Sequence, residues 1–488
     1  EELKAVVLAD SFDELFQPLS LNLPRCLLPL CNVPMLEYTL EVLALSGVVE
    51  TILVCKAHAD KLTAYIKQSQ WARGHAQMKV RVHSVRHATT IGDALRAVDE
   101  SSAIMTDFIL CTGIVISNMN LSRIVAAHVA NKKRDPNHIM TMLLQETTPG
   151  HRRQIKSDES VYFIEPSTSR LLALNSHSAV PRVRTTVIQP DVITAHAEVE
   201  VRADLTDTSI SVCSPDVLAL FTENFDYHIM RRDFIHGILE SDILGKTIYA
   251  HVLGGSASAA GDADGAMAGE GLAFVGHSGY AASVADTAAY DAISRDLIGR
   301  WTYPLCPDSN ADAEYSYNRG AVYKAPSVRL DRESRVEHHV ILGANTRVAG
   351  MASISDAVLG ARCVIGEHST VRGSYLFGDT RVGRNVAIEG AVLGERVTVL
   401  DNVVIERGCL IGDDVTVGPD VRVPAFTRIA RRRMRKAGSP EAVHLDDSDD
   451  DEESAWADAA ERADSGADAD VLDQFDRLAV GAEGVGYV

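Results

Sequence analysis

The chain has 488 residues, of which 46% are apolar, so it has room for two or three domains with real cores and is not disordered throughout. Its formal net charge is −20, and residues 441–488 alone hold 16 acidic and two basic residues, so the remainder is only mildly acidic. Neither charge balance suits a general nucleic-acid binder, whose phosphate contacts need clustered Lys and Arg, and no apolar run approaches the ~20 residues of a membrane helix.

The eight cysteines form no CxxC pair, so a zinc or dithiol motif is not predicted. Several stand within apolar runs and are interpreted as small core residues. The N-terminal EELKAVVLAD lacks the basic start and long apolar core of a secretion signal. We therefore expect reduced thiols in a cytoplasmic protein.

Residues 1–310 alternate strand-like and helix-like stretches. The short apolar run Leu3–Ala9 predicts a buried parallel strand, and a helical apolar pattern follows Pro34 and stops at Gly47. Further strands are predicted at 48–55 and at FILCTG, Phe108–Gly113. This strand–helix–strand order predicts a doubly wound, Rossmann-like α/β domain. Later, 254–271 is predicted to be a surface loop of small residues, and 282–301 a helix with Trp301 on its apolar side.

A helix is also predicted to begin at Ser214-Pro215-Asp216, with the serine as cap and the proline in the first turn. Asn224 and Phe225 would follow its last turn, in the connection to a second apolar helix. An aromatic ring and an amide on a loop suit an anchor for a protein partner. The alternative is that Phe225 lies in the core and Asn224 caps the helix.

Residues 323–432 show a different period, in which aliphatic residues recur at steps of six, with occasional fives. The pattern predicts a left-handed parallel β-helix with one inward side chain per strand, and glycines at corners that need positive φ; a β-sandwich with chance spacing is the alternative. The aliphatic series is Leu330, Val336, Leu342, Val348, Ile354, Leu359, Ile365, Val371, Leu376, Val382, Ile388, Leu393, Val399, Ile405, Ile411, Val417, Val423 and Ile429, with 17-residue markers at Leu342, Leu359, Leu376, Leu393 and Leu410 and glycines Gly343, Gly360, Gly378, Gly394 and Gly412 close behind.

Histidines are present in both parts without a metal-binding motif. His338, His339 and His368 are interpreted as surface residues on turns of the β-helix, because no acyl-acceptor motif accompanies them. His83 and His87 are four apart, but their segment has the pattern of a strand entering a loop. No metal site and no cofactor is therefore predicted. Residues 437–488 are too acidic to collapse and are predicted to be a disordered linker.

The start of the chain resembles the sugar-nucleotide pyrophosphorylases, or nucleotidyltransferases, whose first strand leads into GxGTRLxP and then PKxLLPxxxxP. The matching stretch is LADSFDELFQPLSLNLPRCLLPLCNVP, which keeps the scaffold prolines and leucines. Two carboxylates replace phosphate-cradling glycines, and an apolar residue follows Gly113 where the family has its Mg²⁺ carboxylate. Nucleotidyl transfer is thus predicted to be lost. The degenerate positions are Asp10, Ser11, Asp13, Leu15, Arg25 and Ile114.

With the β-helix behind it, this domain resembles the gamma and epsilon subunits of eukaryotic translation initiation factor 2B, and the segment 206–239 with its Asn224-Phe225 pair is similar to the epsilon type. The resemblance implies a subunit of a guanine-nucleotide exchange factor, with sister subunits of the alpha, beta, gamma and delta types and the GTP-binding subunit of initiation factor 2 as partners. It implies an accessory exchange motif at Asn224 and Phe225. Epsilon subunits continue past an equivalent of GVGYV into an all-helical exchange domain, which the 488 residues are expected to lack. A purely structural gamma-type subunit and an active pyrophosphorylase remain as alternatives.

Overall fold

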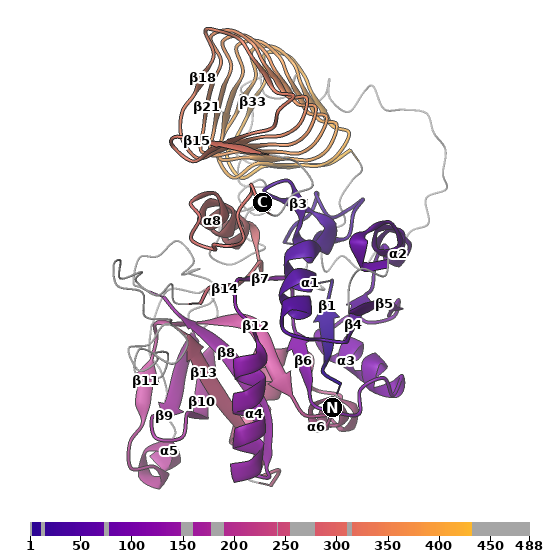
Figure 1. The fold of residues 1–488 in the computed structure, drawn as a ribbon, viewed down its shortest axis with the longest axis vertical. Helices are drawn as coiled ribbons and strands as arrows, with labels where there is room; N and C mark the ends of the chain where they lie inside the picture. Colours follow the sequence, from indigo (N-terminus) through magenta and orange to yellow (C-terminus); the bar gives the residue numbers. More distant parts are fainter. Residues whose placement is uncertain are drawn as a thin grey trace, which may run out of the picture.

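The computed structural model describes residues 2–10, 15–72, 78–147, 160–176, 190–241, 243–253, 279–309 and 315–431 (Figure 1). The predicted loop at 254–271 and the acidic segment at 437–488 lie outside these ranges. Within the ranges, no helix combines the length and the hydrophobicity needed to cross a bilayer.

The N-terminal part is built on one ten-stranded sheet. Four parallel strands form one end of it, β5-β4-β1-β6, and β12 then joins antiparallel to β6. In sheet order the strands are β11 (Glu200–Arg202), β9 (Ser160–Glu165), β10 (Arg170–Ser176), β13 (Thr247–Leu253), β8 (His138–Glu146), β12 (Leu205–Cys213), β6 (Phe108–Cys111), β1 (Lys4–Leu8), β4 (Glu50–Cys55) and β5 (Lys79–Ser84).

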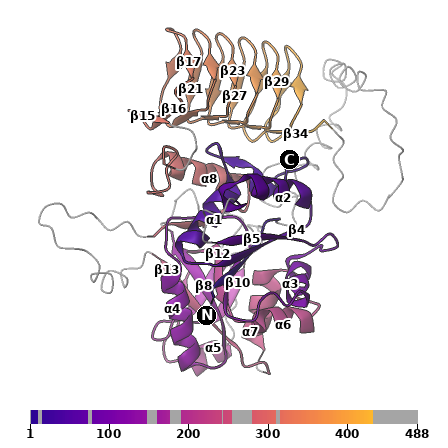
Figure 2. The same cartoon turned by 45° about the vertical axis from the view of Figure 1, so that its right-hand side comes forward.

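Helices cover both faces of this sheet, as the doubly wound prediction requires (Figures 1 and 2). They are α1 (Met35–Leu45), α2 (Ala59–Gln68), α3 (Ile91–Glu100), α4 (Ser122–Arg134), α5 (Pro190–Ala195), α6 (Asp216–Glu223), α7 (His236–Glu240) and α8 (Thr287–Ile298), with short 3₁₀-helices η1 (Arg25–Leu27) and η2 (Gln70–Ala72) and a π-helix η3 (Met230–Ile235). Two small pairs complete this part: β2 (Pro29–Leu30) with β3 (Val33–Pro34), and β7 (Val115–Ser117) with β14 (Ala281–Ser283).

The period of two along the central strands divides the core into two layers. In β1, Val7 faces a cluster that includes α1, α2 and α8, and Val6 faces one that includes α3, α6 and α7. The predicted helix at 282–301 was too long, because its first residues form β14 and α8 begins only at Thr287. Trp301 lies beyond the helix and is 73% exposed, so the prediction of an apolar-side tryptophan was wrong.

Residues 316–429 form a triangular β-helix, which confirms the predicted coil (Figure 1). Its strands pair in parallel except for residues 316–318, which pair antiparallel with residues 322–324. Its first face contains β15 (Ser316–Asn318), β16 (Val322–Lys324), β19 (Val340–Leu342), β22 (Val358–Leu359), β25 (Tyr375–Leu376), β28 (Val392–Leu393), β31 (Leu410–Ile411) and β34 (Arg428–Ile429). The second contains β17 (Arg329–Leu330), β20 (Arg347–Val348), β23 (Val364–Ile365), β26 (Arg381–Val382), β29 (Thr398–Val399) and β32 (Thr416–Val417), and the third contains β18 (Arg335–Val336), β21 (Ser353–Ser355), β24 (Thr370–Arg372), β27 (Ala387–Glu389), β30 (Val404–Ile405) and β33 (Arg422–Val423).

The predicted aliphatic series fills the interior, and it is buried from Leu342 to Val423. Only the first and last members, such as Leu330, are partly exposed. One marker was assigned wrongly. The inward partner of Leu393 is Ile411, one residue after the predicted marker Leu410, because this coil contains 18 residues. Leu410 instead points out of the coil and is buried against the N-terminal part.

The glycines after these markers do not supply the positive φ that was predicted. Most corners are left-handed at polar residues such as Asn345, Asp379 and Asn402, which tolerate that conformation. Gly343 is needed for a different reason: an added Cβ would lie 2.5 Å from the backbone of Gly360 in the next coil. Side chains at equivalent corners of successive coils also pair with each other, as Arg362 does with Asp379 at 2.6 Å.

The first face of the β-helix packs on the N-terminal part, and both contribute to one apolar cluster. The Tyr375 hydroxyl donates to the Asp291 carboxylate of α8 at 2.7 Å, and the Tyr323 hydroxyl donates to the Ile298 carbonyl at 3.0 Å. Asn32, between β2 and β3, donates to the Leu359 carbonyl at 3.0 Å. These contacts hold the β-helix in a defined place above α8 and β3 (Figure 1). The predicted domain limits at residues 310, 323 and 432 stay predictions.

Candidate partner-binding site

The first candidate region is the loop that follows β1, where the resemblance places a phosphate cradle. Asp10 begins this loop, and its Oδ2 accepts a hydrogen bond from the backbone N–H of Ala57 at 3.2 Å. Leu15 is 36% exposed. Ser11 and Asp13 lie outside the described residues. The Asp10 carboxylate therefore takes up the Ala57 N–H, in the region where a phosphate would need free N–H donors.

Arg25, which stands at the family's lysine position, is committed to the protein interior. Its side chain is buried, and Nη2 donates to the carbonyls of Val284 and Ala285, the second at 2.8 Å. The guanidinium also lies 4.5 Å from the centre of the Phe16 ring. These contacts connect η1, which contains Arg25, to the segment before α8, so the side chain of this arginine has a structural role.

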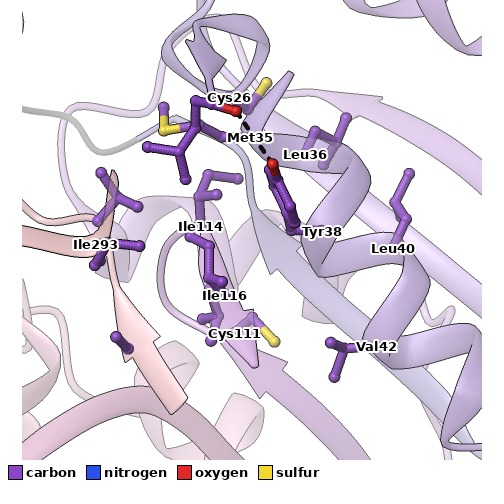
Figure 3. Close-up of a cluster of buried hydrophobic side chains, with 14 of the residues drawn as sticks. Cys26, Met35, Leu36, Tyr38, Leu40, Val42, Cys111, Ile114, Ile116 and Ile293 are labelled. Carbon is purple, nitrogen blue, oxygen red and sulfur yellow. Dashed lines mark hydrogen bonds between the residues drawn. The ribbon is translucent and has the colours of Figure 1, made fainter. Parts of the chain in front are cut away.

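Ile114 occupies the position where the family has a metal-binding carboxylate. It is 2% exposed and belongs to the core cluster beneath α1 and α8. Figure 3 shows it among Met35, Ile116 and Ile293, with the buried thiol of Cys111 below. A hydrocarbon side chain in this place offers no ligand atom and gains its stability from burial.

The second candidate region is the connection after α6, on the other layer of the sheet. Asn224 is the C-cap residue of α6, and its N–H bonds to the Leu220 carbonyl at 3.1 Å. Phe225 is 73% exposed, so the alternative that placed its ring in the core was wrong. The helix begins at Asp216, and the hydroxyl of Ser214 does not cap it.

One arginine from α3 organises this connection. Nε of Arg96 donates to the Phe221 carbonyl at 2.9 Å, and Nη2 donates to the Phe225 carbonyl at 2.8 Å. The carbonyls of Asn224 and Tyr227 lie 3.4 and 3.2 Å from the same nitrogen. The positive charge of Arg96 also interacts favourably with the negative, C-terminal end of the α6 dipole. One guanidinium therefore holds the backbone carbonyls between residues 221 and 227.

The same guanidinium supports the exposed ring. The Arg96 carbon Cζ lies 5.2 Å from the centre of the Phe225 ring, within cation–π range. Nη1 of Arg96 pairs with Asp93 at 2.7 Å. Burial opposes ionisation of Asp93, but hydrogen bonds from Thr89 and Thr90 outweigh it and lower the pKa of Asp93 to about 2. The carboxylate thus stays charged and holds Arg96 in place.

Close packing fixes the rest of the connection. Gly92 lies against Tyr227, where an added Cβ would come within 2.0 Å of the tyrosine carbonyl. The Tyr227 ring meets Phe221 and Phe234 edge-on, and these two phenylalanines stack at 4.5 Å. We define residues 224–229 as the Asn-Phe loop. It presents an exposed aromatic ring on a closely packed base, an arrangement that would suit an anchor for a protein partner.

Sequence reasoning missed Arg96 and Gly92. A signal for their helix existed in Thr90 and Asp93, which form a capping box three residues apart. Nothing in the sequence links that helix to α6, which lies more than 100 residues further along. The structure does not bring the two candidate regions together, because Ile114 belongs to one core layer and Phe221 to the other.

Comparisons with known proteins assign both parts of the chain. Residues 4–150 match the family model for nucleotidyl transferase, and residues 319–423 match the model for the EIF2B subunit epsilon LbH domain, a left-handed β-helix. The fold is therefore a nucleotidyltransferase-like α/β domain followed by a left-handed parallel β-helix.

Curated relatives of the chain include subunits of translation initiation factor eIF2B. Translation initiation factor eIF2B subunit epsilon of Schizosaccharomyces pombe is 40% identical over 347 residues, which are 71% of this chain and 48% of that protein. The Dictyostelium discoideum epsilon subunit is 38% identical over 345 residues, 70% of this chain and 45% of its own length. The S. pombe gamma subunit is 28% identical over 247 residues, 48% of this chain and 50% of that subunit. The chain is thus related to the eIF2B epsilon subunits and spans about half the length of those it matches.

Proposed function

We propose that this chain is a subunit of a guanine-nucleotide exchange complex of the eIF2B type, which promotes GDP release from translation initiation factor 2. Its partners would be sister subunits of the alpha, beta, gamma and delta types and the GTP-binding subunit of initiation factor 2. The similarity to epsilon subunits supports this assignment, since it spans both the α/β domain and the β-helix. Within the complex the chain would serve in assembly and as an accessory exchange surface.

The observation that carries the proposal is the exposed Phe225 ring on its Arg96 base. A phenylalanine that leaves nearly three quarters of its surface in water gains little from folding. Its hydrophobic surface becomes useful when a partner covers it. We assign Asn224 and Phe225 to contact with the GTP-binding subunit of initiation factor 2.

We propose further that nucleotidyl transfer is lost. The three chemical requirements are a phosphate cradle, a basic side chain free to meet phosphate, and a metal-binding carboxylate. Asp10 bonds to a backbone N–H, Arg25 bonds to carbonyls in the interior, and Ile114 is packed in the core. We expect no pyrophosphate release from nucleoside triphosphates with sugar phosphates, in a coupled assay run beside an active nucleotidyltransferase. A rate comparable with that enzyme would overturn this part of the proposal.

The assembly and contact roles are tested by reconstitution with the complete subunit. The subunit is co-expressed with its four sister subunits, purified as a complex, and titrated with initiation factor 2. We expect Phe225→Ala to leave the subunit composition unchanged and to weaken binding of initiation factor 2, because truncating a central aromatic anchor costs about 2 kcal/mol, roughly thirtyfold in Kd. Trp301→Ala is the matched control, since that ring is equally exposed but lies after α8. Failure of the wild-type chain to join the sister subunits would refute the assignment itself.

A further inference from the structure

Two histidines and one carboxylate meet at the edge of the β-helix, far from the Asn-Phe loop. His338 and His339 stand between β18 and β19, and Asp356 stands between β21 and β22 in the following coil. Nε2 of His338 lies 3.2 Å from Oδ2 of Asp356, and Nδ1 of His339 lies 3.1 Å from Oδ1. The nitrogens and the carboxylate lie within 4.8 Å of one another.

The coil period explains why these residues meet. Asp356 follows His339 by 17 residues, so the two occupy the same corner in successive coils. Both are left-handed, with φ of 52° and 50°, and the Asp356 N–H donates to the His338 carbonyl at 2.9 Å. The positions of the three Cα atoms are therefore set by the backbone ladder. The sequence favoured a plain surface role for the histidines because no acyl-acceptor motif accompanies them, and it did not reveal the carboxylate in the next coil.

This donor set suits a borderline divalent metal. Zn²⁺ is bound by imidazole nitrogen and carboxylate oxygen at roughly 2.0–2.2 Å in tetrahedral sites, which places neighbouring ligand atoms about 3.3 Å apart. The two nitrogen–oxygen separations, 3.2 Å to Oδ2 and 3.1 Å to Oδ1 of Asp356, are close to that spacing, and one ligand atom from each residue lies within 4.8 Å of the others. The side chains are partly exposed, at 52, 46 and 26%, so a fourth position faces water.

We propose that His338, His339 and Asp356 form a three-ligand site for a divalent transition metal of the Zn²⁺ class. In the metal-free protein each imidazole can direct an N–H at the carboxylate; on binding, each ring adopts the tautomer that presents its lone pair. The metal would then link two successive coils at the end of the β-helix where burial is least complete. The inference is independent of the proposed exchange function.

One charge nearby limits the affinity. Burial lowers the pKa of the Arg295 guanidinium of α8, but Asp291, which pairs with its Nε at 2.9 Å, and to a smaller extent Asp356 outweigh this and raise it. A guanidinium close to the only carboxylate of the site disfavours a dication. We therefore expect a dissociation constant in the micromolar range.

The test is a metal titration of the untagged chain. Zn²⁺ is titrated against a chromophoric chelator, and Co²⁺ is followed by its visible absorption, which is intense when the ion is tetrahedral. We expect one equivalent to bind, and Asp356→Asn and His339→Asn each to weaken binding at least tenfold. Asparagine tolerates the left-handed corner, so both variants should fold. His368→Asn is the matched control, because His368 is an exposed left-handed corner residue at another edge.

The outcomes separate the alternatives. Loss of binding in both ligand variants, with binding retained in the His368→Asn control, supports the site. Wild-type affinity weaker than millimolar, or unchanged affinity in Asp356→Asn and His339→Asn, overturns it. Circular dichroism of every variant identifies any loss of binding that arises from misfolding. If one ligand variant misfolds, the other still decides the question.

Discussion

Arg96 offers the sharpest test of how the Asn-Phe loop is held. Arg96→Ala removes the guanidinium that bonds to the carbonyls of Phe221 and Phe225 and supports the exposed ring. A hydrogen bond to a charged group contributes about 1.5–3 kcal/mol, and a cation–π contact about 0.5–1 kcal/mol at an exposed site. Because several acceptors share the guanidinium and water can replace part of the loss, we expect the free energy of unfolding to fall by about 2–4 kcal/mol.

Binding distinguishes a positioning residue from one that only stabilises the fold. We expect Arg96→Ala to weaken binding of initiation factor 2 to the reconstituted complex about as much as Phe225→Ala. The Kd of the double variant should lie within about twofold of the Kd of the single variant that binds less tightly. The reason is that both changes remove the same contact, the exposed Phe225 ring. Arg81→Ala serves as control, because this arginine is exposed on the edge strand β5 and should change stability by less than about 1 kcal/mol. A folded Arg96→Ala complex with unchanged affinity would refute this reasoning.

Three further predictions concern stability. Leu376→Asp places an unpaired carboxylate in the β-helix interior and should prevent folding, while Val364→Asp on the outer side should not, as circular dichroism and soluble yield would reveal. Gly343→Ala should lower the melting temperature through a cost of about 1–3 kcal/mol, since its Cβ would overlap the next coil; an unchanged value would contradict the stacking described above. Burial lowers the pKa values of His128 and His138 to about 4, so the unfolded chain takes up protons first as pH falls from about 6.5. The free energy of unfolding measured in urea should fall by roughly 2 kcal/mol per imidazole between pH 7 and pH 4.5, and a flat profile would count against the buried pair.

The β-helix could be predicted from the sequence because each of its strands turns only one side chain inward. A six-residue step in Leu342, Val348 and Ile354 therefore records the coil directly. The role of the glycines could not be predicted in this way. Both a left-handed corner and a close approach of the next coil favour glycine, and only the position of Gly360 above Gly343 separates the two.

The candidate site was predicted in part. The order of apolar residues located Asn224 and Phe225 after the last turn of α6, but it did not decide whether the ring faced the core or water. Burial at a helix end depends on which neighbour covers it. Here the neighbour is Arg96 of α3, which contacts the Phe225 ring but leaves most of it exposed. Contacts of this kind between distant helices leave no periodic trace in one sequence.

The measurement that tests the central claim most directly is GDP release from initiation factor 2. The factor is loaded with fluorescent GDP and mixed with matched concentrations of complexes that contain the complete subunit as wild type, Phe225→Ala or Trp301→Ala. With initiation factor 2 below saturation, we predict a clearly slower release with Phe225→Ala, with unchanged subunit composition and melting temperature, and a wild-type rate with Trp301→Ala. Equal rates for wild type and Phe225→Ala would contradict the assignment of the Asn-Phe loop as an exchange surface.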